Sequence, residues 1–238
     1  MQNAPPNWIA KDCLDVGLFT NNLEPMLSFW QSEIGLSFDH MLPVGGGVRQ
    51  YRHDYEGAVL KLNHARDPLQ LASAGGYRRL IIGRDDVAMP KDLTDPDGNH
   101  VQLLPRGTDG IAHWALEVSA SNLEQFFDHY HGQLGLPRDA VRPDAVRCGR
   151  SLIVGVVAPE TSKQTDGDEM RRLGFRYTTI QVSKVDSVHA TAIRNGADQG
   201  APPQTLGKTA RISFLKDACG NWMELSQRAS ITGSLAPG

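Results

Sequence analysis

The side chains best suited to metal binding or proton transfer lie on a predicted strand near the middle of the chain. Residues 112–118 alternate between two faces, so His113 and Glu117 share one face while Trp114 and Leu116 share the other. The apolar face must be covered by a helix, which leaves His113 and Glu117 on the opposite surface. An imidazole can bind a divalent ion or carry a proton, and Glu117 suits a catalytic proton acceptor.

Two other histidines and the three cysteines give weaker indications of a functional site. His53 and His64 fall on adjacent predicted strands, which leaves open a metal pair, a proton shuttle and a structural role. No carboxylate belongs to the same pattern, so the structural role is favoured. The three cysteines are odd in number and far apart in sequence. They favour reduced thiols in a cytoplasm over a disulfide framework or a zinc site.

Two helices that must support these strands repeat one pattern about a hundred residues apart. Each has apolar residues at i, i+3, i+4, i+7 and i+11, which form one stripe on a helix. The stripes are Leu23, Met26, Leu27, Trp30 and Ile34, and Leu123, Phe126, Phe127, Tyr130 and Leu134. Asn22 and Asn122 precede the helices as predicted N-caps, and Gly35 and Gly135 follow them.

A second element repeats as a D-x-x-G-N turn. Residues 95–99 form the first copy and lead to Gln102, and residues 217–221 form the second and lead to Glu224. Asp and Asn accept backbone hydrogen bonds in such turns, and Gly adopts a positive φ. Each turn therefore predicts a tight connection into a short strand.

These repeats predict four β-α-β-β-β units in two pairs, 12–65 with 75–105 and 111–160 with 173–228. Gly35 and Gly135 are 100 positions apart, whereas Asp95 and Asp217 are 122 apart, so unit 2 is 22 residues short. Residues 85–91 also lack a helical stripe. We therefore expect unit 2 to lack its helix and one strand.

The combined pattern resembles the vicinal oxygen chelate superfamily, which includes glyoxalase I, bleomycin-resistance proteins and extradiol dioxygenases. The resemblance covers residues 12–228 and implies an α+β fold of curled, mostly antiparallel cup-shaped sheets with helices outside. We expect domains at 12–105 and 111–228, followed by a tail at 229–238. The resemblance also implies a small-molecule ligand.

The resemblance further implies a divalent metal in the C-terminal cup. Superfamily ligands occupy the first strand of each unit and the last strand after the turn, which correspond here to His113, Tyr177 and Glu224. Imidazole and carboxylate suit a divalent first-row metal, and Fe, Mn, Zn and Ni stay open, as does the absence of a metal. Tyr177 would act as a ligand or as an acid–base group, although the phenol is a poor ligand until it ionises.

The corresponding N-terminal positions are Asp15, Lys61, Arg79 and Gln102. Two cations would repel a metal ion, so we expect none there. One interpretation is a ligand-binding set that grips an acidic group. The favoured interpretation is that Lys61 and Arg79 pair with Asp15 and fix the sheet.

Composition narrows the function classes. The chain has 238 residues, 40% of them hydrophobic, and a net charge of −3. This balance argues against a nucleic-acid binder, and no apolar run is long enough to cross a membrane. A metal-dependent enzyme acting on a small oxygenated substrate and a metal-free binding protein of the bleomycin-resistance type both stay open, with an enzyme leading. Homo-oligomerisation also stays open.

Overall fold

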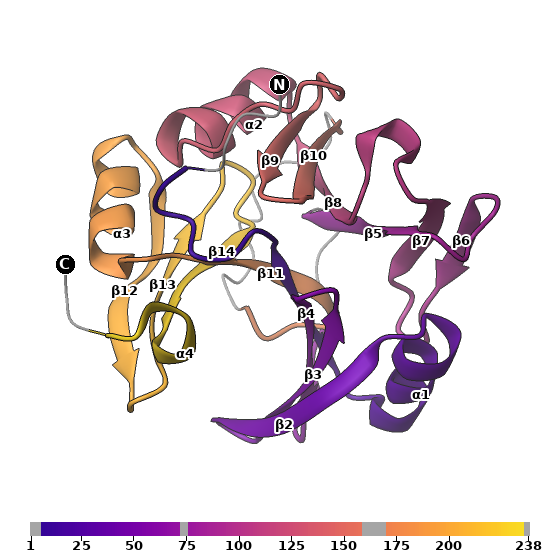
Figure 1. Ribbon diagram of the computed structural model, residues 1–238. Helices are drawn as coiled ribbons and strands as arrows, with labels where there is room; N and C mark the ends of the chain where they lie inside the picture. Colours follow the sequence, from indigo (N-terminus) through magenta and orange to yellow (C-terminus); the bar gives the residue numbers. More distant parts are fainter. Residues whose placement is uncertain (1–5, 72–75, 159–169, 236–238) are drawn as a thin grey trace.

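The computed structural model describes residues 6–71, 76–158 and 170–235, which form four units in two sheets (Figure 1). Unit 1 consists of β1 (Asp15–Thr20), α1 (Leu23–Ser28), β2 (Ser37–Gly45), β3 (Val48–Tyr55) and β4 (Ala58–Ala65). Unit 4 consists of β11 (Gly174–Gln181), α3 (Val185–Arg194), β12 (Asp198–Leu206), β13 (Ala210–Lys216) and β14 (Trp222–Arg228). These two units form one sheet of eight strands in the order β12-β13-β14-β11-β1-β4-β3-β2.

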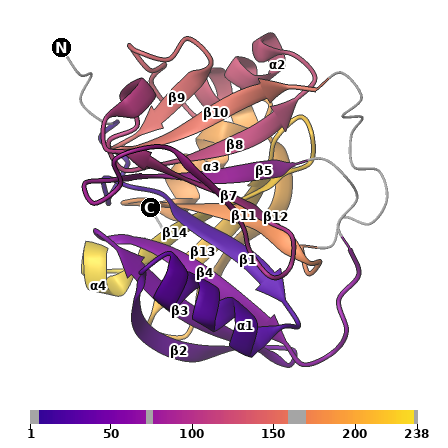
Figure 2. The ribbon, with the colours of Figure 1, turned by 90° about the vertical axis from the view of Figure 1, so that its right-hand side faces the viewer.

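Units 2 and 3 form the second sheet. Unit 2 consists of β5 (Tyr77–Arg84), β6 (Lys91–Thr94) and β7 (His100–Pro105). Unit 3 consists of β8 (Trp114–Ala120), α2 (Leu123–Phe127), β9 (Ala145–Cys148) and β10 (Ser151–Val157). The six strands follow the order β6-β7-β5-β8-β10-β9, and Figure 2 shows this sheet above the strands of unit 1.

The expected pairing of units is wrong. Unit 1 joins unit 4 through antiparallel β1 and β11, and unit 2 joins unit 3 through antiparallel β5 and β8. Each expected domain, 12–105 or 111–228, therefore contributes strands to both sheets. Each of the four units begins with an equivalent strand, so the repeat pattern does not specify which two of these first strands pair.

The expected α+β fold with a shortened second unit is confirmed. Among the described residues, β5 and β6 are joined without a helix, and unit 2 has three strands. Antiparallel strand pairs outnumber parallel ones in the two sheets. The predicted tail contains the short helix α4 (Ala229–Thr232), and residues 236–238 lie outside the described residues.

The two striped helices have different N-caps. The Asn122 side chain accepts a hydrogen bond from Gln125 N at 2.9 Å, as expected. Asn22 makes no such bond, and Thr20 Oγ1 instead accepts from the Asn22 backbone N–H at 2.8 Å. Both helices continue as π-helical turns, Phe29–Glu33 and Asp128–Gln133, and end before glycines with φ of +81° and +76°.

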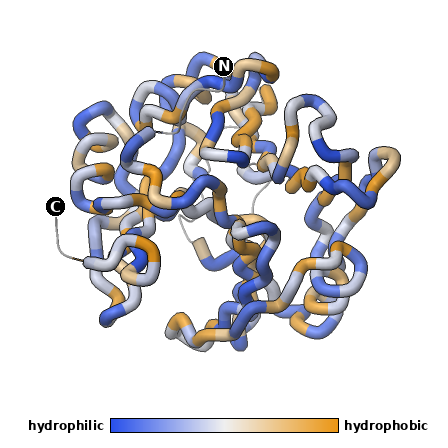
Figure 3. The backbone as a smooth tube through the Cα atoms, in the orientation of Figure 1, coloured by the Kyte–Doolittle hydropathy of each residue, from blue (hydrophilic) through white to orange (hydrophobic). Residues whose placement is uncertain are grey.

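Alternation along the strands separates an apolar face from a polar one, and Figure 3 shows hydrophobic and hydrophilic residues interleaved along the chain. The apolar faces of the two sheets share one core with α1, to which β1 contributes Leu18, β5 contributes Leu80 and β8 contributes Trp114. The opposite, concave face of the eight-stranded sheet carries buried polar residues such as Asp15 and Lys61. The shared apolar core therefore leaves this polar face free to form a site.

Two further findings bear on the expectations from composition. All three cysteines are buried and free. No helix in the described ranges is long and apolar enough to cross a membrane.

Gly17 sits where the sheet must accommodate an aromatic ring. It pairs with Tyr177 across β1 and β11, and a Cβ on Gly17 would lie 2.2 Å from the Tyr177 ring. Gly17→Ala should therefore lower the free energy of unfolding by about 1–3 kcal/mol, because the ring must leave its position. Urea unfolding monitored by circular dichroism measures this loss.

The matched control is Gly132→Ala, since Gly132 is exposed and an added Cβ there meets no atom closer than 3.5 Å. We expect that variant to be at least as stable as the parent. Equal unfolding midpoints for the parent and Gly17→Ala would contradict the packing described here.

Candidate functional site

The concave side of the eight-stranded sheet encloses a cavity of about 750 Å³. Its walls are largely apolar and come from strands of both units 1 and 4. The apolar lining includes Phe19, Leu42, Val48, Leu206, Ile212 and Phe214. The polar lining includes Gln50, Asn63, Lys61, Tyr177, Glu224 and Arg228. A cavity of this size with a few convergent polar groups has the usual form of a small-molecule site.

A buried ion pair forms part of the cavity lining. Lys61 Nζ donates to Glu224 Oε2 at 2.6 Å and to Thr179 Oγ1 at 2.6 Å. Thr179 Oγ1 donates in turn to Glu224 Oε2 at 2.7 Å. Burial lowers the pKa of Lys61, while the Glu224 and Asp15 carboxylates oppose that fall. The three side chains therefore form a closed network that joins β4 to β11 and β14.

Asp15 lies fully buried beside this network. Its carboxylate accepts hydrogen bonds from Lys11 Nζ, from Val59 N at 2.9 Å and from Gln181 Nε2 at 3.1 Å. Burial would raise the pKa of Asp15, but the charges of Lys11 and Lys61 hold it below its ordinary value. Asp15 therefore stays ionised, and its carboxylate oxygens are occupied by these three hydrogen-bond donors.

Tyr177 presents a neutral phenol to the same cavity. Its hydroxyl oxygen accepts from Asn63 Nδ2 at 3.2 Å and from Gln50 Nε2 at 3.3 Å. Burial raises the pKa of Tyr177 far above its ordinary value, and the Glu224 charge adds to that rise. Because only the phenolate is a good metal ligand, this environment disfavours metal binding by Tyr177.

His113 lies apart from this cavity, directly before β8 of the six-stranded sheet. Its Nε2 lies 3.1 Å from the Tyr55 carbonyl oxygen, and its Nδ1 lies 3.3 Å from Ser151 Oγ. A carbonyl only accepts, so Nε2 carries the proton and Nδ1 accepts from the serine hydroxyl. Both ring nitrogens are thus engaged, and neither is available to a metal ion.

The structure therefore brings together two members of the expected ligand set and not the third. Tyr177 and Glu224 lie on the adjacent strands β11 and β14 and line one cavity. His113 belongs to the other sheet because unit 3 pairs with unit 2. The strand alternation predicted around His113 holds, since Trp114 and Leu116 lie in the shared core.

The other expected site residues also divide between the sheets. Arg79 makes a bidentate ion pair with Glu117, at 3.0 and 2.6 Å, instead of pairing with Asp15. Gln102 Nε2 donates to Asp92 Oδ1 at 2.8 Å. Asp15 and Lys61 belong to the eight-stranded sheet, so the four N-terminal positions do not form one ligand-binding set.

Sequence reasoning missed several polar residues of the cavity. Asn63 follows Lys61 by two positions on β4, so alternation from Lys61 would have placed it on the same face. Alternation from Glu224 along β14 leads in the same way to Arg228, at the end of that strand. Gln50 had no such signal, because it lies on the neighbouring strand β3 and faces the cavity only once β3 and β4 are in register.

The residues of the eight-stranded cup do not fit a divalent metal. The first and last strands of units 1 and 4 supply Asp15, Lys61, Tyr177 and Glu224. The ammonium of Lys61 bonds directly to the Glu224 carboxylate. A cation placed beside Glu224 would meet that ammonium at close range. Within the described ranges, no three His, Cys, Asp or Glu side chains come together as a metal site.

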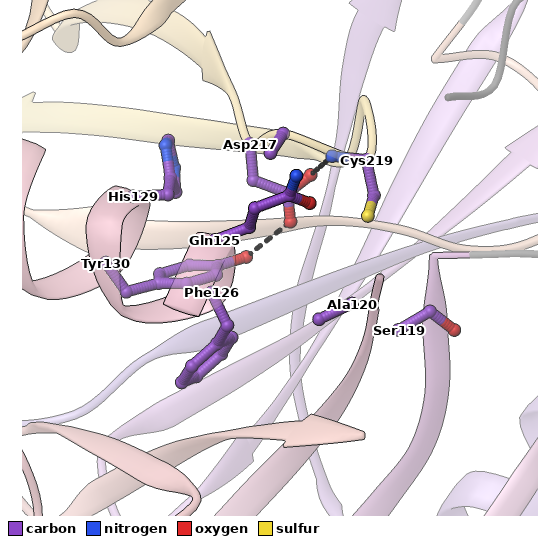
Figure 4. Close-up of a pocket in the computed structure, with 9 residues that line it drawn as sticks. Ser119, Ala120, Gln125, Phe126, His129, Tyr130, Asp217 and Cys219 are labelled. Carbon is purple, nitrogen blue, oxygen red and sulfur yellow. Dashed lines mark hydrogen bonds between the residues drawn. The ribbon is translucent and has the colours of Figure 1, made fainter. Parts of the chain in front are cut away.

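A second cavity lies at the repeated turn after β13 and measures about 10 Å³, the space of a single water (Figure 4). Tyr130 donates its hydroxyl proton to Asp217 Oδ2 at 2.9 Å, and Cys219 N donates to Asp217 Oδ1 at 2.9 Å. Asp217 thus ties the D-x-x-G-N turn to the unit 3 helical segment. This cavity is structural and too small for an organic ligand.

The buried state of His113 predicts a pH dependence of stability. Burial lowers the pKa of His113 to about 4, whereas an unfolded histidine titrates near 6.5. Between these values the unfolded state binds a proton that the folded state does not, so stability falls as the pH falls. The contribution of this one histidine is at most about 1.4 kcal/mol per pH unit.

Urea unfolding at pH 7, 6 and 5 measures that slope. In His113→Gln, the free energy of unfolding should depend less steeply on pH than in the parent. Some pH dependence should remain, because burial also lowers the pKa of His53 to about 4. Identical slopes for the parent and His113→Gln would show that His113 is not buried in its neutral form.

Comparison with known proteins gives a fold relationship. No family model and no curated protein matches the sequence. A mutant of glyoxalase I from Zea mays superposes with a TM-score of 0.71 at 13% identity, over 93% of this chain and 95% of that one. Unmutated glyoxalase I from Zea mays gives a TM-score of 0.70 at 12% identity, over 90% and 92% of the two chains.

A putative dioxygenase from Bacillus subtilis subsp. subtilis str. 168 gives a TM-score of 0.65 at 11% identity, over 98% of this chain and 92% of that one. At such identities the likeness concerns the fold alone. The match nevertheless spans all four units in each comparison. The chain therefore has the same four-unit fold as these structures, which agrees with the fold that the resemblance in its sequence implies.

Proposed function

We propose that this protein binds a small organic molecule in the cup of the eight-stranded sheet and that it does so without a metal ion. The observation that carries the proposal is the Lys61–Glu224 ion pair in the cavity lining. Lys61 Nζ lies 2.6 Å from Glu224 Oε2 and supplies the positive charge that a metal would otherwise bring to this carboxylate. The alternative of a metal-free binding protein is thereby favoured.

The cavity offers an apolar ligand a suitable surface. Its volume of about 750 Å³ falls in the range of small-molecule sites, about 300–1,000 Å³. The rings of Phe19 and Phe214 lie with centroids 6.3 and 6.5 Å from that of Tyr177. These rings can contact a flat or aliphatic body through dispersion and hydrophobic burial.

The alternative of a metal-dependent enzyme draws less support. It requires His113, Tyr177 and Glu224 around one ion, with Glu117 as the proton acceptor. His113 has both ring nitrogens engaged elsewhere, and Glu117 is bound to Arg79. A cytoplasmic location and homo-oligomerisation stay predictions from the sequence.

The proposal predicts metal-independent binding of the neutral fluorescent probe N-phenyl-1-naphthylamine. Purified protein should contain substoichiometric metal, and addition of EDTA should change neither the probe affinity nor the thermal unfolding midpoint. Ile212→Trp should weaken probe binding by about tenfold or more, a loss of about 1.4 kcal/mol, because the larger ring fills the cavity. Fluorescence titration measures the affinities.

Val141→Trp is the matched control, since Val141 is exposed and does not line the cavity. It should bind the probe like the parent. Probe binding that disappears with EDTA and returns with added metal would refute metal-independent binding. Equal probe affinities in the parent and Ile212→Trp would place the binding site elsewhere.

A further inference from the structure

Two arginines on the concave face of the eight-stranded sheet have incompletely satisfied guanidinium groups. Arg52, on β3, is 5% exposed and donates from one terminal nitrogen to Gln50 Oε1 at 2.9 Å. Its buried Nε has no hydrogen-bond partner. Arg228, at the end of β14, lines the cavity, and its Nε is likewise buried without a partner.

The nearby carboxylates are already committed to other cations. Glu224 bonds to Lys61, and Asp15 bonds to Lys11. Within the described ranges, neither Arg52 nor Arg228 makes an ion pair. Among the described residues, the cup and its immediate surroundings therefore hold five cationic side chains, Lys11, Arg52, Lys61, Arg171 and Arg228, against the two carboxylates of Asp15 and Glu224.

The two guanidinium groups also act on one another. Burial lowers the pKa of Arg52 from its ordinary value, and the charge of Arg228 lowers it further, while Asp15 and Glu224 oppose the fall. A buried cation without a counter-charge is unfavourable, so an anion entering the cup would relieve this repulsion. Guanidinium groups bind carboxylate, sulfonate or phosphate oxygens through paired N–H donors.

We propose that the ligand of this cup is an organic anion whose acidic group binds Arg228, with Arg52 supplying a second positive charge through its hydrogen bond to Gln50. This inference rests on the proposed function, since it names the class of molecule that the cup takes. The apolar body of the ligand contacts Phe19, Val48 and Phe214, which line the same cavity as Arg228. Gln50 also lines the cavity and joins Arg52 to its surface.

A pair of fluorescent probes tests the charge of the ligand. 8-Anilinonaphthalene-1-sulfonate and N-phenyl-1-naphthylamine share an aromatic body, and only the first carries an acidic group. Arg228→Met should weaken binding of the sulfonate by about tenfold or more, in line with the loss of a hydrogen bond to a charged group. Its affinity for the neutral probe should stay within about twofold, a change of about 0.4 kcal/mol.

Three further variants sharpen the test. Arg52→Met should weaken sulfonate binding by a smaller factor than Arg228→Met, because Arg52 acts through Gln50. Arg228→Lys should retain more sulfonate affinity than Arg228→Met, since it keeps the charge. Arg49→Met removes an exposed arginine from the same strand as Arg52 and should leave both affinities unchanged. Thermal unfolding of each variant confirms that it is folded.

The outcomes separate this inference from the proposed function. If Arg228→Met leaves sulfonate affinity unchanged, or weakens both probes equally, the anion inference is overturned while small-molecule binding stands. If Arg49→Met weakens sulfonate binding as much as Arg228→Met, the sulfonate responds to surface charge and the inference is overturned. If the parent binds neither probe, the proposed function and this inference fall together.

Discussion

The contact between Lys61 and Glu224 is the constraint on which the architecture of the cup depends. The two residues lie on β4 and β14, which are separated by β1 and β11 in the sheet. Three strand spacings amount to about 14 Å in a flat sheet. The Nζ–Oε2 distance of 2.6 Å therefore shows that both long side chains reach toward each other over the two intervening strands, on the face where units 1 and 4 line one cavity.

A buried ion pair needs further hydrogen bonds to offset the loss of hydration. Thr179 supplies them, because its hydroxyl accepts from Lys61 and donates to Glu224. Gly17 contributes space, since its missing side chain leaves room for the Tyr177 ring above the same sheet. Packing and charge thus act together: the apolar face of the sheet holds the core, and the polar face forms a site whose positive charges exceed its carboxylates.

Local features of this fold could be predicted from the sequence, and long-range ones could not. The helical stripes, the repeated turns and the shortened second unit depend on short spacings that are visible in one chain. Alternation around His113 was also predictable, because it concerns one strand. Its position relative to Glu224 was not, since that depends on which first strands pair, β1 with β11 or β1 with β5. Arg79 meets Glu117 for the same reason, whereas the contact of Asp15 with Lys11 is local, four positions apart in the sequence.

A crystal structure of the protein grown with excess Mn²⁺ tests the central claim most directly, with diffraction data that locate manganese by its anomalous scattering. If the ion pair occupies the place of a metal, the density will show Lys61 Nζ in contact with Glu224 and no anomalous peak beside that carboxylate. An anomalous peak coordinated by Glu224, with the Lys61 side chain displaced, would contradict the account.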